Sequence, residues 1–313
     1  KIHGEDMNGD GEGDFGSCIF KKRNAQSYFA IQTFAAPIVQ TQGTAQGFHF
    51  DNATMKPIIN NEGWKKAFEL YKATGKYGPP DELNMDIGDT RALFKAGRCG
   101  LIVEWGDPGT LQLDDDAKSI RGKMYAISAV GSTEVLDRAT GKLVPVSAAT
   151  APYAVDGINY APFAAFGGWA GAVNKGADAK TKAAAYAFLS YMNQAAQSGV
   201  DVTIGATGYN PYRTSQLAST DLWVKAGMPK ALADNYLGAI NGAINNLNMA
   251  SDMKIPGAQK YTSVVLDTEL ARYLAGEITV DEALANIEEG WEEVTEDFGR
   301  DEEVASQALA LGL

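Results

Sequence analysis

Apolar residues recur at the i, i+3, i+4, i+7 spacing of an amphipathic helix in four stretches of the chain. The first stretch, 64–74, follows Asn61, a residue type that favours helix N-caps. The last follows Thr279, which opens the Thr-x-x-Glu spelling of a capping box. We therefore expect four helices, each with apolar residues on one face. In chain order, these faces carry Trp64, Ala67, Phe68 and Tyr71; Ala185, Phe188, Leu189 and Met192; Leu266, Leu270 and Tyr273; and Leu284, Ile287, Trp291 and Val294.

Short apolar runs lie between these stretches and predict β-strands at 16–20, 99–105, 124–130 and 168–173. The run Leu101-Ile102-Val103 stands close to glycines and lacks polar alternation, which is typical of a strand covered on both faces. Helices on both sides of a mostly parallel sheet would cover it in this way, so we predict an α/β fold. The segment 131–162 is rich in small and turn-forming residues and predicts loops with short hairpins.

With 313 residues, the chain is long enough for two lobes with a core in each, because single cores seldom grow past about 250 residues. No apolar run approaches the roughly 20 residues that a membrane-spanning helix needs. The first ten residues lack the apolar core of a signal peptide, so we expect any export signal to lie upstream of this sequence.

Charge and the scarcity of certain residue types argue against several functions. The net charge of -12 argues against nucleic acid as a partner, because phosphate contacts need clustered Lys and Arg. The two cysteines lack the spacing of a zinc site. The two histidines, His3 and His49, stand outside any nucleophile motif, so we expect both to be structural or surface residues rather than catalytic ones.

The stretch 6–16, DMNGDGEGDFG, matches two motif templates. Its glycines spell the GxGxxG of a dinucleotide-binding turn, in which a helix follows the glycines and its amides meet the phosphates. Here a strand-like segment follows instead, and four carboxylates would repel a pyrophosphate. We therefore discount the nucleotide template and expect no organic cofactor.

The same stretch follows the first part of a calcium loop, which places oxygen ligands at alternate positions and a glycine at position six. Gly11 is that glycine, whereas position twelve is Ser17 instead of a bidentate Glu. Two interpretations stay open: a structural Ca²⁺ ion, or a polar turn that holds no metal. The candidate ligands are Asp6, Asn8, Asp10, Glu12 and Asp14.

The chain contains six segments, in this order: DMNGDGEGDFG, FDNATMKPIINNEGWKKAFELYKA, TRALFKAGRCGLIVEWGDPG, FGGWAGAVNKGADAKTKAAAYAFLSYM, GYNPYR and KIPGAQKYTSVVLDTELARYLAGEITVDEALANIEEGWEEV. Together they resemble the extracellular solute-binding proteins of ABC importers, in the sugar-binding branch that is maltose-binding-protein-like. The resemblance spans nearly the whole chain. It depends on the order of the segments, since none of them is diagnostic alone.

The resemblance implies a periplasmic-binding-protein-like fold of two lobes joined by a hinge. Members of the family begin with further βα units, so the first lobe is expected to be incomplete in this chain. Residues 1–168 would form the main part of the second lobe, and 169–250 the hinge crossing and the remaining part of the first lobe. Residues 251–313 would return to the second lobe with the C-terminal helices.

The resemblance also implies a ligand held between lobes that close by hinge rotation. Sugar recognition combines flat aromatic faces with a few polar groups in a concave site. Trp105 and Asp107 follow a predicted buried strand, where the crevices of α/β sheets lie, and Trp169 falls at the proposed crossing. For each aromatic residue, the alternative role is packing. The candidate ligand-binding residues are Trp105, Trp169, Arg213, Tyr28, Asp107 and Tyr209.

An extracytoplasmic location, whether periplasmic, cell-surface or secreted, follows from the resemblance. In such an oxidising compartment we expect Cys18 and Cys99 to form a disulfide, the alternative being two buried free thiols. Asn52-Ala53-Thr54 is a glycosylation sequon that matters only in a eukaryotic host and is otherwise a turn.

The function that the resemblance implies is non-enzymatic binding of a small polar solute, most simply a mono- or oligosaccharide, for transport with a membrane permease. The alternative is the ectodomain of a membrane receptor or a surface protein that uses the fold for sensing or for protein contacts. A glycoside hydrolase would need two carboxyl groups on opposite sides of a sugar. Glu104 and Asp107 are close in sequence, but closeness in sequence does not establish that geometry.

Overall fold

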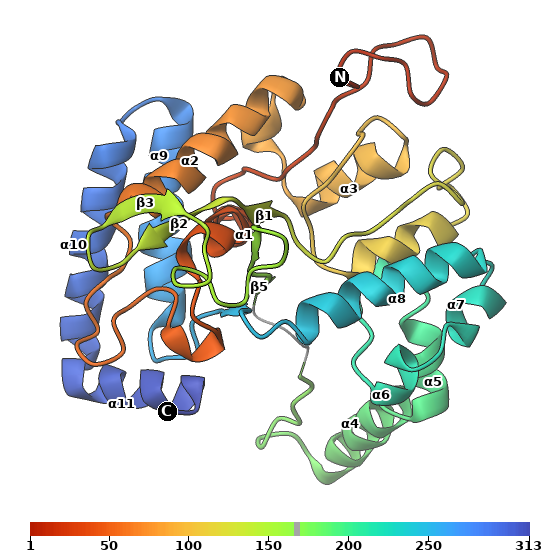
Figure 1. Cartoon of the computed structure of the whole chain (residues 1–313). Helices are drawn as coiled ribbons and strands as arrows, with labels where there is room; N and C mark the ends of the chain where they lie inside the picture. Colours follow the sequence, from red (N-terminus) through yellow and green to blue (C-terminus); the bar gives the residue numbers. More distant parts are fainter. Residues whose placement is uncertain (166–169) are drawn as a thin grey trace. The chain divides into compact units, whose positions relative to one another are not determined.

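The chain divides into two units in the computed structural model, which describes residues 1–165 and 170–313 (Figure 1). The first unit comprises Lys1–Glu104, Ser128–Phe166 and Gly242–Leu313, and the second comprises Trp105–Ile127 and Gly167–Asn241. These boundaries differ from the lobe boundaries that the resemblance implies, because 105–127 join the second unit and 242–250 join the first.

Local sequence signals account for the start of two helices in the first unit. Asn61 caps α2, since its side-chain oxygen accepts the Gly63 and Trp64 N–H groups at 2.9 and 3.1 Å. Thr279 and Glu282 form the predicted capping box of α10. The helices of this unit are α1 (Ser27–Val39), α2 (Glu62–Thr74), α3 (Ile87–Lys95), α9 (Asp267–Ala275), α10 (Val280–Phe298) and α11 (Arg300–Leu311), with a π-helix at Lys260–Leu266 and 3₁₀ turns at Thr44–Gln46, Gly75–Tyr77 and Glu82–Asn84.

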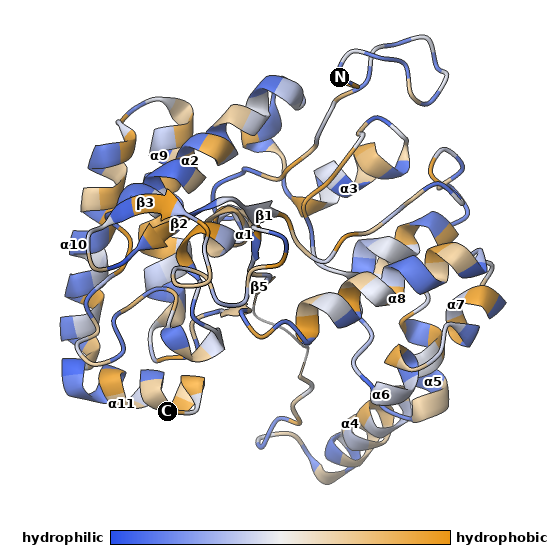
Figure 2. Cartoon of the chain, viewed as in Figure 1, coloured by the Kyte–Doolittle hydropathy of each residue, from blue (hydrophilic) through white to orange (hydrophobic). Residues whose placement is uncertain are grey.

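The apolar faces predicted for these helices meet in an aromatic core. Trp64, Tyr261 and Trp291 are completely buried, and the Trp291 indole donates to the Tyr261 carbonyl oxygen at 2.8 Å. The Phe50 ring lies 5.2 Å from the ring of Tyr261 and 5.2 Å from that of Trp291. Figure 2 shows hydrophilic and hydrophobic residues alternating around α10. At about 25 cal/mol per Å² and roughly 200 Å² per ring, each buried ring contributes about 5 kcal/mol before conformational entropy is subtracted.

His49 lies inside this core with an exposed fraction of 3%. Its Nε2 atom is hydrogen-bonded to the Gln32 side-chain oxygen, and the rings of Phe50 and Trp291 lie 6.3 and 5.9 Å away. Burial lowers the pKa of His49 to about 3, because a charged imidazolium would lose its water. The residue is therefore a neutral part of the core, in agreement with the structural role expected for it.

The strands of the first unit are short and form two-stranded pairs. Strands β1 (Gly131–Ser132) and β4 (Asn159–Tyr160) pair antiparallel, as do β2 (Glu134–Asp137) and β3 (Lys142–Pro145). Strands β5 (Phe163–Ala164) and β6 (Ala250–Ser251) pair in parallel. The hairpin of β2 and β3 lies within the segment where short hairpins were predicted.

The predicted strands 16–20 and 99–105 lie side by side but pair only at isolated bridges. The Cys18 N–H donates to the Leu101 carbonyl oxygen at 3.0 Å, and parallel bridges join Phe15 to Cys99 and Cys18 to Ile102. The prediction that 101–103 is covered on both faces is wrong, because Leu101 has an exposed fraction of 48%. The predictions of strands at 124–130 and, among its described residues 170–173, at 168–173 are also wrong.

A disulfide joins Cys18 to Cys99, as predicted, with the Cα atoms 5.8 Å apart. The two cysteines are 81 positions apart in the sequence, and the bridge fastens the 15–18 segment to its parallel neighbour. A loop of this length favours stabilisation by a few kcal/mol, since the bridge restricts the unfolded chain.

The second unit is mainly helical. Its core gathers around Trp223 and Tyr236, whose rings lie 5.9 Å apart, and includes Val202, Met228, Leu232, Ala233 and Leu237. None of the helices in the described part of the chain is long and apolar enough to cross a membrane. The elements are a 3₁₀ helix (Asp107–Leu113), α4 (Ala179–Met192), α5 (Ala195–Asp201), a 3₁₀ turn (Gly205–Thr207), α6 (Thr214–Leu217), α7 (Asp221–Lys225) and α8 (Lys230–Ile244), which begins in this unit.

Helix α4 forms where the apolar periodicity predicts it, but its apolar face is not in a core. No residue of α4 is buried, and Phe188 has an exposed fraction of 61%. The Asp178 side chain caps the helix by accepting the Thr181 N–H at 2.9 Å. The prediction of the helix is therefore confirmed, and its apolar residues lie outside the core of the unit.

Candidate functional site

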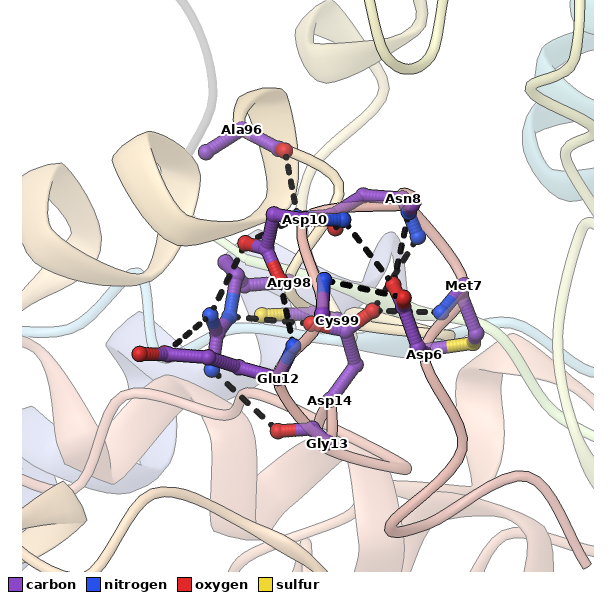
Figure 3. A network of polar contacts seen from close by, with 12 residues as sticks. Asp6, Met7, Asn8, Asp10, Glu12, Gly13, Asp14, Ala96, Arg98 and Cys99 are labelled. Atoms are coloured by element: carbon purple, nitrogen blue, oxygen red, sulfur yellow. Dashed lines mark hydrogen bonds and ion pairs between the residues drawn. The ribbon is translucent and has the colours of Figure 1, made fainter.

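In the acidic loop 6–14, backbone N–H groups donate hydrogen bonds to the side-chain carboxylates of the same loop (Figure 3). The Asp6 carboxylate accepts the N–H groups of Gly9, Asp10 and Gly11 at 2.6, 3.2 and 3.0 Å. The Asp14 carboxylate accepts the Met7 N–H at 2.6 Å. These carboxylate oxygens stabilise turns, which is the usual role of Asp and Asn in such a sequence.

The Arg98 guanidinium, which comes from outside the loop, provides the positive charge next to its carboxylates (Figure 3). Its Nη1 atom lies 3.1 Å from Asp10 Oδ2 and 2.9 Å from Glu12 Oε2, and its Nε atom lies 2.9 Å from Asp14 Oδ1. Its Nη2 atom donates to the Gly13 carbonyl oxygen at 3.2 Å. The hydrogen bond to Glu12, followed by those to Asp10 and the nearby negative charges, raises the pKa of Arg98.

This geometry does not fit the calcium interpretation of the loop. Three of the four carboxylates face Arg98, and the fourth, that of Asp6, is occupied by backbone N–H groups. Among residues 1–165 and 170–313, no group of three or more His, Cys, Asp or Glu side chains is arranged to hold a metal ion. A guanidinium has several N–H donors in one plane and can pair with clustered carboxylates. Arg98 therefore provides the positive charge that a metal ion would have provided in this loop.

Two segments with predicted ligand-binding residues lie against each other in the second unit. A Cβ atom at Gly106 would lie 2.5 Å from Asn210 Oδ1, so a larger residue at this position would require the Asn210 side chain to move. A Cβ atom at Gly208 would lie 3.9 Å from Asp107 Oδ2. The structure therefore brings the segment 105–107, with its half-buried Trp105, together with the segment 208–210.

Asp107 and Tyr209 differ in solvent exposure. Asp107 begins the 3₁₀ helix and has an exposed fraction of only 3%. Burial, and to a lesser extent the charge of Asp107, raise the pKa of Tyr236, so the carboxylate lies near the core of this unit. Tyr209 is half-buried and packs against the same core. Asp107 and Tyr209 therefore connect the segments 105–107 and 208–210 to the core of the second unit.

Arg213 has structural partners within the second unit. Its Nε atom donates to Ser198 Oγ at 3.1 Å, and its Nη2 atom donates to the Asn193 carbonyl oxygen. The guanidinium also lies 5.5 Å from the ring of Tyr212. Arg213 thus connects the start of α6 to the junction of α4 and α5, and a ligand would have to compete with these contacts or use the remaining donors.

Tyr28 lies in the first turn of α1 in the first unit, with a half-buried side chain. Burial raises the pKa of Tyr28, and the charges of Asp267 and Asp252 raise it further, so both carboxylates lie near the phenol. Asp267 Oδ2 accepts the Asn24 N–H at 2.6 Å. Burial raises the pKa of Asp267 to about 6. The neighbourhood of Tyr28 is therefore acidic and partly closed to water.

Of the two remaining residues named from the sequence, the structure describes Glu104 but not Trp169. Trp169 lies outside the described residues. Glu104 is held by Arg91, whose Nε and Nη2 atoms donate to the two carboxylate oxygens at 3.0 and 2.9 Å. The Glu104 side chain has an exposed fraction of 3%. Glu104 and Asp107 thus do not form the solvent-facing carboxylate pair that a glycoside hydrolase needs.

Sequence reasoning missed Asp252 as a member of the neighbourhood of Tyr28. Asp252 directly follows β6, which is parallel to β5, and its N–H donates to the Ala164 carbonyl oxygen at 3.2 Å. Residues just past the carboxyl ends of parallel strands are favoured positions for ligand contacts. Predicting the role of Asp252 would therefore have required a prediction of β6. This strand has only two residues, and the apolar pattern does not predict it.

Comparison with known proteins reveals similarity at the level of the fold. No protein-family model matches the sequence, and no curated protein does. Among solved structures, the maltose-bound MalE3 of T. maritima aligns with a TM-score of 0.61 and 16% identity over 90% of this chain. A ribitol complex of an ABC transporter solute-binding protein from Agrobacterium radiobacter K84 gives 0.60 and 18% over 90% of this chain. The D-mannitol complex of such a protein from Agrobacterium vitis S4 gives 0.55 and 18% over 91%.

The chain spans 60–62% of the length of these three structures. The matches extend over nine-tenths of the present chain and thus include residues of both units. The predicted α/β, periplasmic-binding-protein-like fold is confirmed. The chain has the fold of the solute-binding proteins of ABC transporters.

Proposed function

We propose that this protein binds a small, hydroxyl-rich solute of the saccharide or polyol class and releases it chemically unchanged. The observation that carries this proposal is the shared fold of three solute-binding structures whose ligands are maltose, ribitol and D-mannitol. These ligands have in common a dense set of hydroxyl groups and no net charge. A ligand of that chemistry needs hydrogen-bond acceptors, planar donors and an apolar surface for its C–H groups.

The described residues supply such groups in each unit. In the second unit, the half-buried Trp105 is a candidate aromatic surface, and its segment 105–107, with the buried Asp107, lies against the segment 208–210 that carries Asn210. Tyr28 offers a phenol beside the carboxylates of Asp252 and Asp267 in the first unit. A phenol and a carboxylate can each form hydrogen bonds with sugar hydroxyls, whereas an indole face packs against C–H groups. Trp169, Tyr209 and Arg213 stay candidate contacts on the resemblance alone.

We further propose an extracytoplasmic location and a role in import together with a membrane permease. The fold of ABC transporter solute-binding proteins supports the role, and the disulfide supports the location, since disulfides persist in oxidising compartments. Binding without catalysis is favoured because Glu104 is paired with Arg91 and Asp107 is buried, which leaves no carboxylate pair for glycoside hydrolysis at that position.

Isothermal titration calorimetry with maltose, ribitol, D-mannitol and a control amino acid tests the proposal. We expect saturable binding of at least one hydroxyl-rich solute, with no product detected by chromatography after incubation. Trp105→Ala should weaken that binding at least tenfold, because it removes an aromatic face of the site. Tyr186→Ala, at an aromatic residue of the same unit with an exposed fraction of 70%, is the matched control and should leave it unchanged.

Failure to bind any saccharide or polyol by protein with an intact unfolding transition would contradict the proposal. An equal loss of binding affinity in Trp105→Ala and Tyr186→Ala would contradict the assignment of Trp105 to the site. It would leave the proposed solute class unchanged. A new sugar product in the incubation would replace the binding function by an enzymatic one.

A further inference from the structure

The C-terminal helix α11 is attached to the first unit through a short set of polar contacts. It follows α10 across Gly299, whose φ of 92° is a backbone conformation that glycine adopts readily. The Arg300 side chain donates to Glu292, to Glu296 and, at 2.9 Å, to the Thr54 carbonyl oxygen. Further along the helix, Gln307 donates to Asn52 Oδ1 at 3.3 Å. Gly299 is therefore a natural pivot between the two helices.

Glu303 is the exceptional residue of this helix because its side chain is buried with an exposed fraction of 0%. Within the described part of the chain, neither of its carboxylate oxygens has a hydrogen-bond partner. An ionised carboxylate without partners is very costly away from water, whereas a protonated carboxyl carries no net charge and is far easier to bury. The geometry therefore selects the neutral form of Glu303 while α11 is docked.

The charged groups near Glu303 offer no compensating cation. Glu302 precedes it on α11 and raises its pKa further, after burial, which is the main cause. On α10, Glu292 and Glu296 pair with Arg300, so the charge of that guanidinium is already balanced by two carboxylates. From the π-helix, the phenol of Tyr261 is hydrogen-bonded to Thr295 and lies within the influence of the Glu303 charge.

The turn 51–56 contributes no free charge to Glu303 either. The Asp51 carboxylate accepts the Thr54 hydroxyl at 2.7 Å, and Lys56 is exposed. Glu303 lies in the first turn of α11, where the helix dipole favours the ionised form, so burial raises the pKa against that effect. Together, burial and this surrounding raise the pKa of Glu303 to about 7.

We propose that Glu303 is a proton-dependent latch: its protonated carboxyl keeps α11 docked, and its ionisation favours opening of α11 about Gly299. The open helix exposes Glu303 to water, where the carboxylate is stable. The latch depends on packing in the first unit and is independent of any solute that the protein binds.

The direction of the pH effect follows from proton binding. Docked Glu303 holds its proton up to about pH 7, whereas exposed Glu303 has the ordinary pKa of 4.5 and loses it earlier. The docked state binds more protons in this window, so docking weakens as the pH rises from 4.5 to 7 and changes little above it. Between pH 5 and pH 7.5, the equilibrium constant for opening should rise about fiftyfold.

Hydrogen–deuterium exchange of the full chain at pH 5 and pH 7.5, corrected for intrinsic exchange rates, tests the latch. Peptides from 300–311 should lose protection by about fiftyfold at the higher pH, while peptides from α2 serve as the internal reference. Glu303→Gln mimics the protonated carboxyl and should remove the pH dependence. Asp301→Asn, at an exposed carboxylate of the same helix, is the matched control and should keep it.

The wild-type chain by itself can overturn the proposal. Protection of 300–311 that is equal at both pH values, or that changes in step with α2, would rule out a local latch. A carbon-13 NMR titration of the Glu303 carboxyl in the wild-type protein gives an independent measurement. A midpoint near the ordinary pKa of a glutamate there, or a pH dependence that persists in Glu303→Gln, would equally contradict the proposal.

Discussion

Helices α2 and α4 were both predicted from apolar residues at helical spacing, but the apolar residues of α2 are confined to one face, whereas those of α4 are spread around the helix. In α2, the side chains of Trp64, Phe68 and Tyr71 are completely buried. In α4, Tyr186 and Phe188 have exposed fractions of 70% and 61%, and no residue is buried. The comparison shows that apolar residues at helical spacing predict where a helix forms. Whether those residues become part of a core depends also on neighbouring elements that lie elsewhere in the sequence.

The strongest test of this contrast removes one large ring from each environment. Trp291→Ala in the first-unit core should lower the free energy of unfolding by about 4 kcal/mol, because it leaves a large cavity and removes the indole hydrogen bond to the Tyr261 carbonyl. Phe188→Ala on α4 should change it by less than about 0.5 kcal/mol. Urea unfolding monitored by circular dichroism measures both, and similar losses in the two variants would contradict the contrast.

A second test removes the covalent link that only the first unit contains. The double variant Cys18→Ser, Cys99→Ser should lower the free energy of unfolding by roughly 3 kcal/mol, since the long loop between the two positions is no longer closed in the unfolded chain. Urea unfolding with and without a reductant measures the effect. The reductant should destabilise the wild-type protein and leave the double variant unchanged, and an equal response in both would exclude a role for the bridge.

A third test uses the buried histidine of the first-unit core. His49 has a folded-state pKa of about 3 and an unfolded value of 6.5, so the unfolded chain binds the extra proton first. Stability should therefore fall as the pH drops below 6.5, by roughly 2.5 kcal/mol at about pH 4.5 from this residue alone. His49→Gln should lose less stability over that range than the wild type. Parallel acid profiles for the two proteins would show that His49 is hydrated.

The smallest effect is expected at the acidic loop 6–14, most of whose residues are exposed to solvent. Arg98→Ala should lower the melting temperature only slightly, because its partners Asp10 and Glu12 are exposed and the buried Asp14 keeps the Met7 N–H as a donor. Millimolar calcium should leave the melting temperature of the wild-type protein unchanged, as Arg98 already pairs with Asp10, Glu12 and Asp14. Differential scanning calorimetry checks both expectations, and a calcium-dependent rise would restore the metal site.

The features that the sequence predicted well are those whose causes are local. Asn61 and Thr279 bond to N–H groups two or three residues away, so a short stretch contains all the information for these helix starts. The disulfide required in addition the compartment that the resemblance implies, because spacing alone does not pair Cys18 with Cys99.

The features that the sequence did not predict depend on distant residues. The acidic loop matches a calcium template until Arg98, far along the chain, is placed among its carboxylates. The segment 124–130 has a strand-like composition, yet in the structure the Asn235 side chain bonds to both the N–H and the carbonyl oxygen of Ala126, at 2.8 and 3.0 Å. In the candidate site, Trp105 was predicted from its position after a run of apolar residues. Asp252 depends on the parallel pairing of β5 and β6, whose sequences lie far apart.

The division of the chain also determines how the protein can be taken apart. Residues 105–127 and 167–241 form the second unit, but 128–166 between them belong to the first. Neither unit is therefore encoded by one continuous stretch, and neither can be produced as a simple truncation. A protease that cuts once within 105–127 leaves the two units joined by the chain that follows the cut, so a single nick there cannot release either unit as a separate particle.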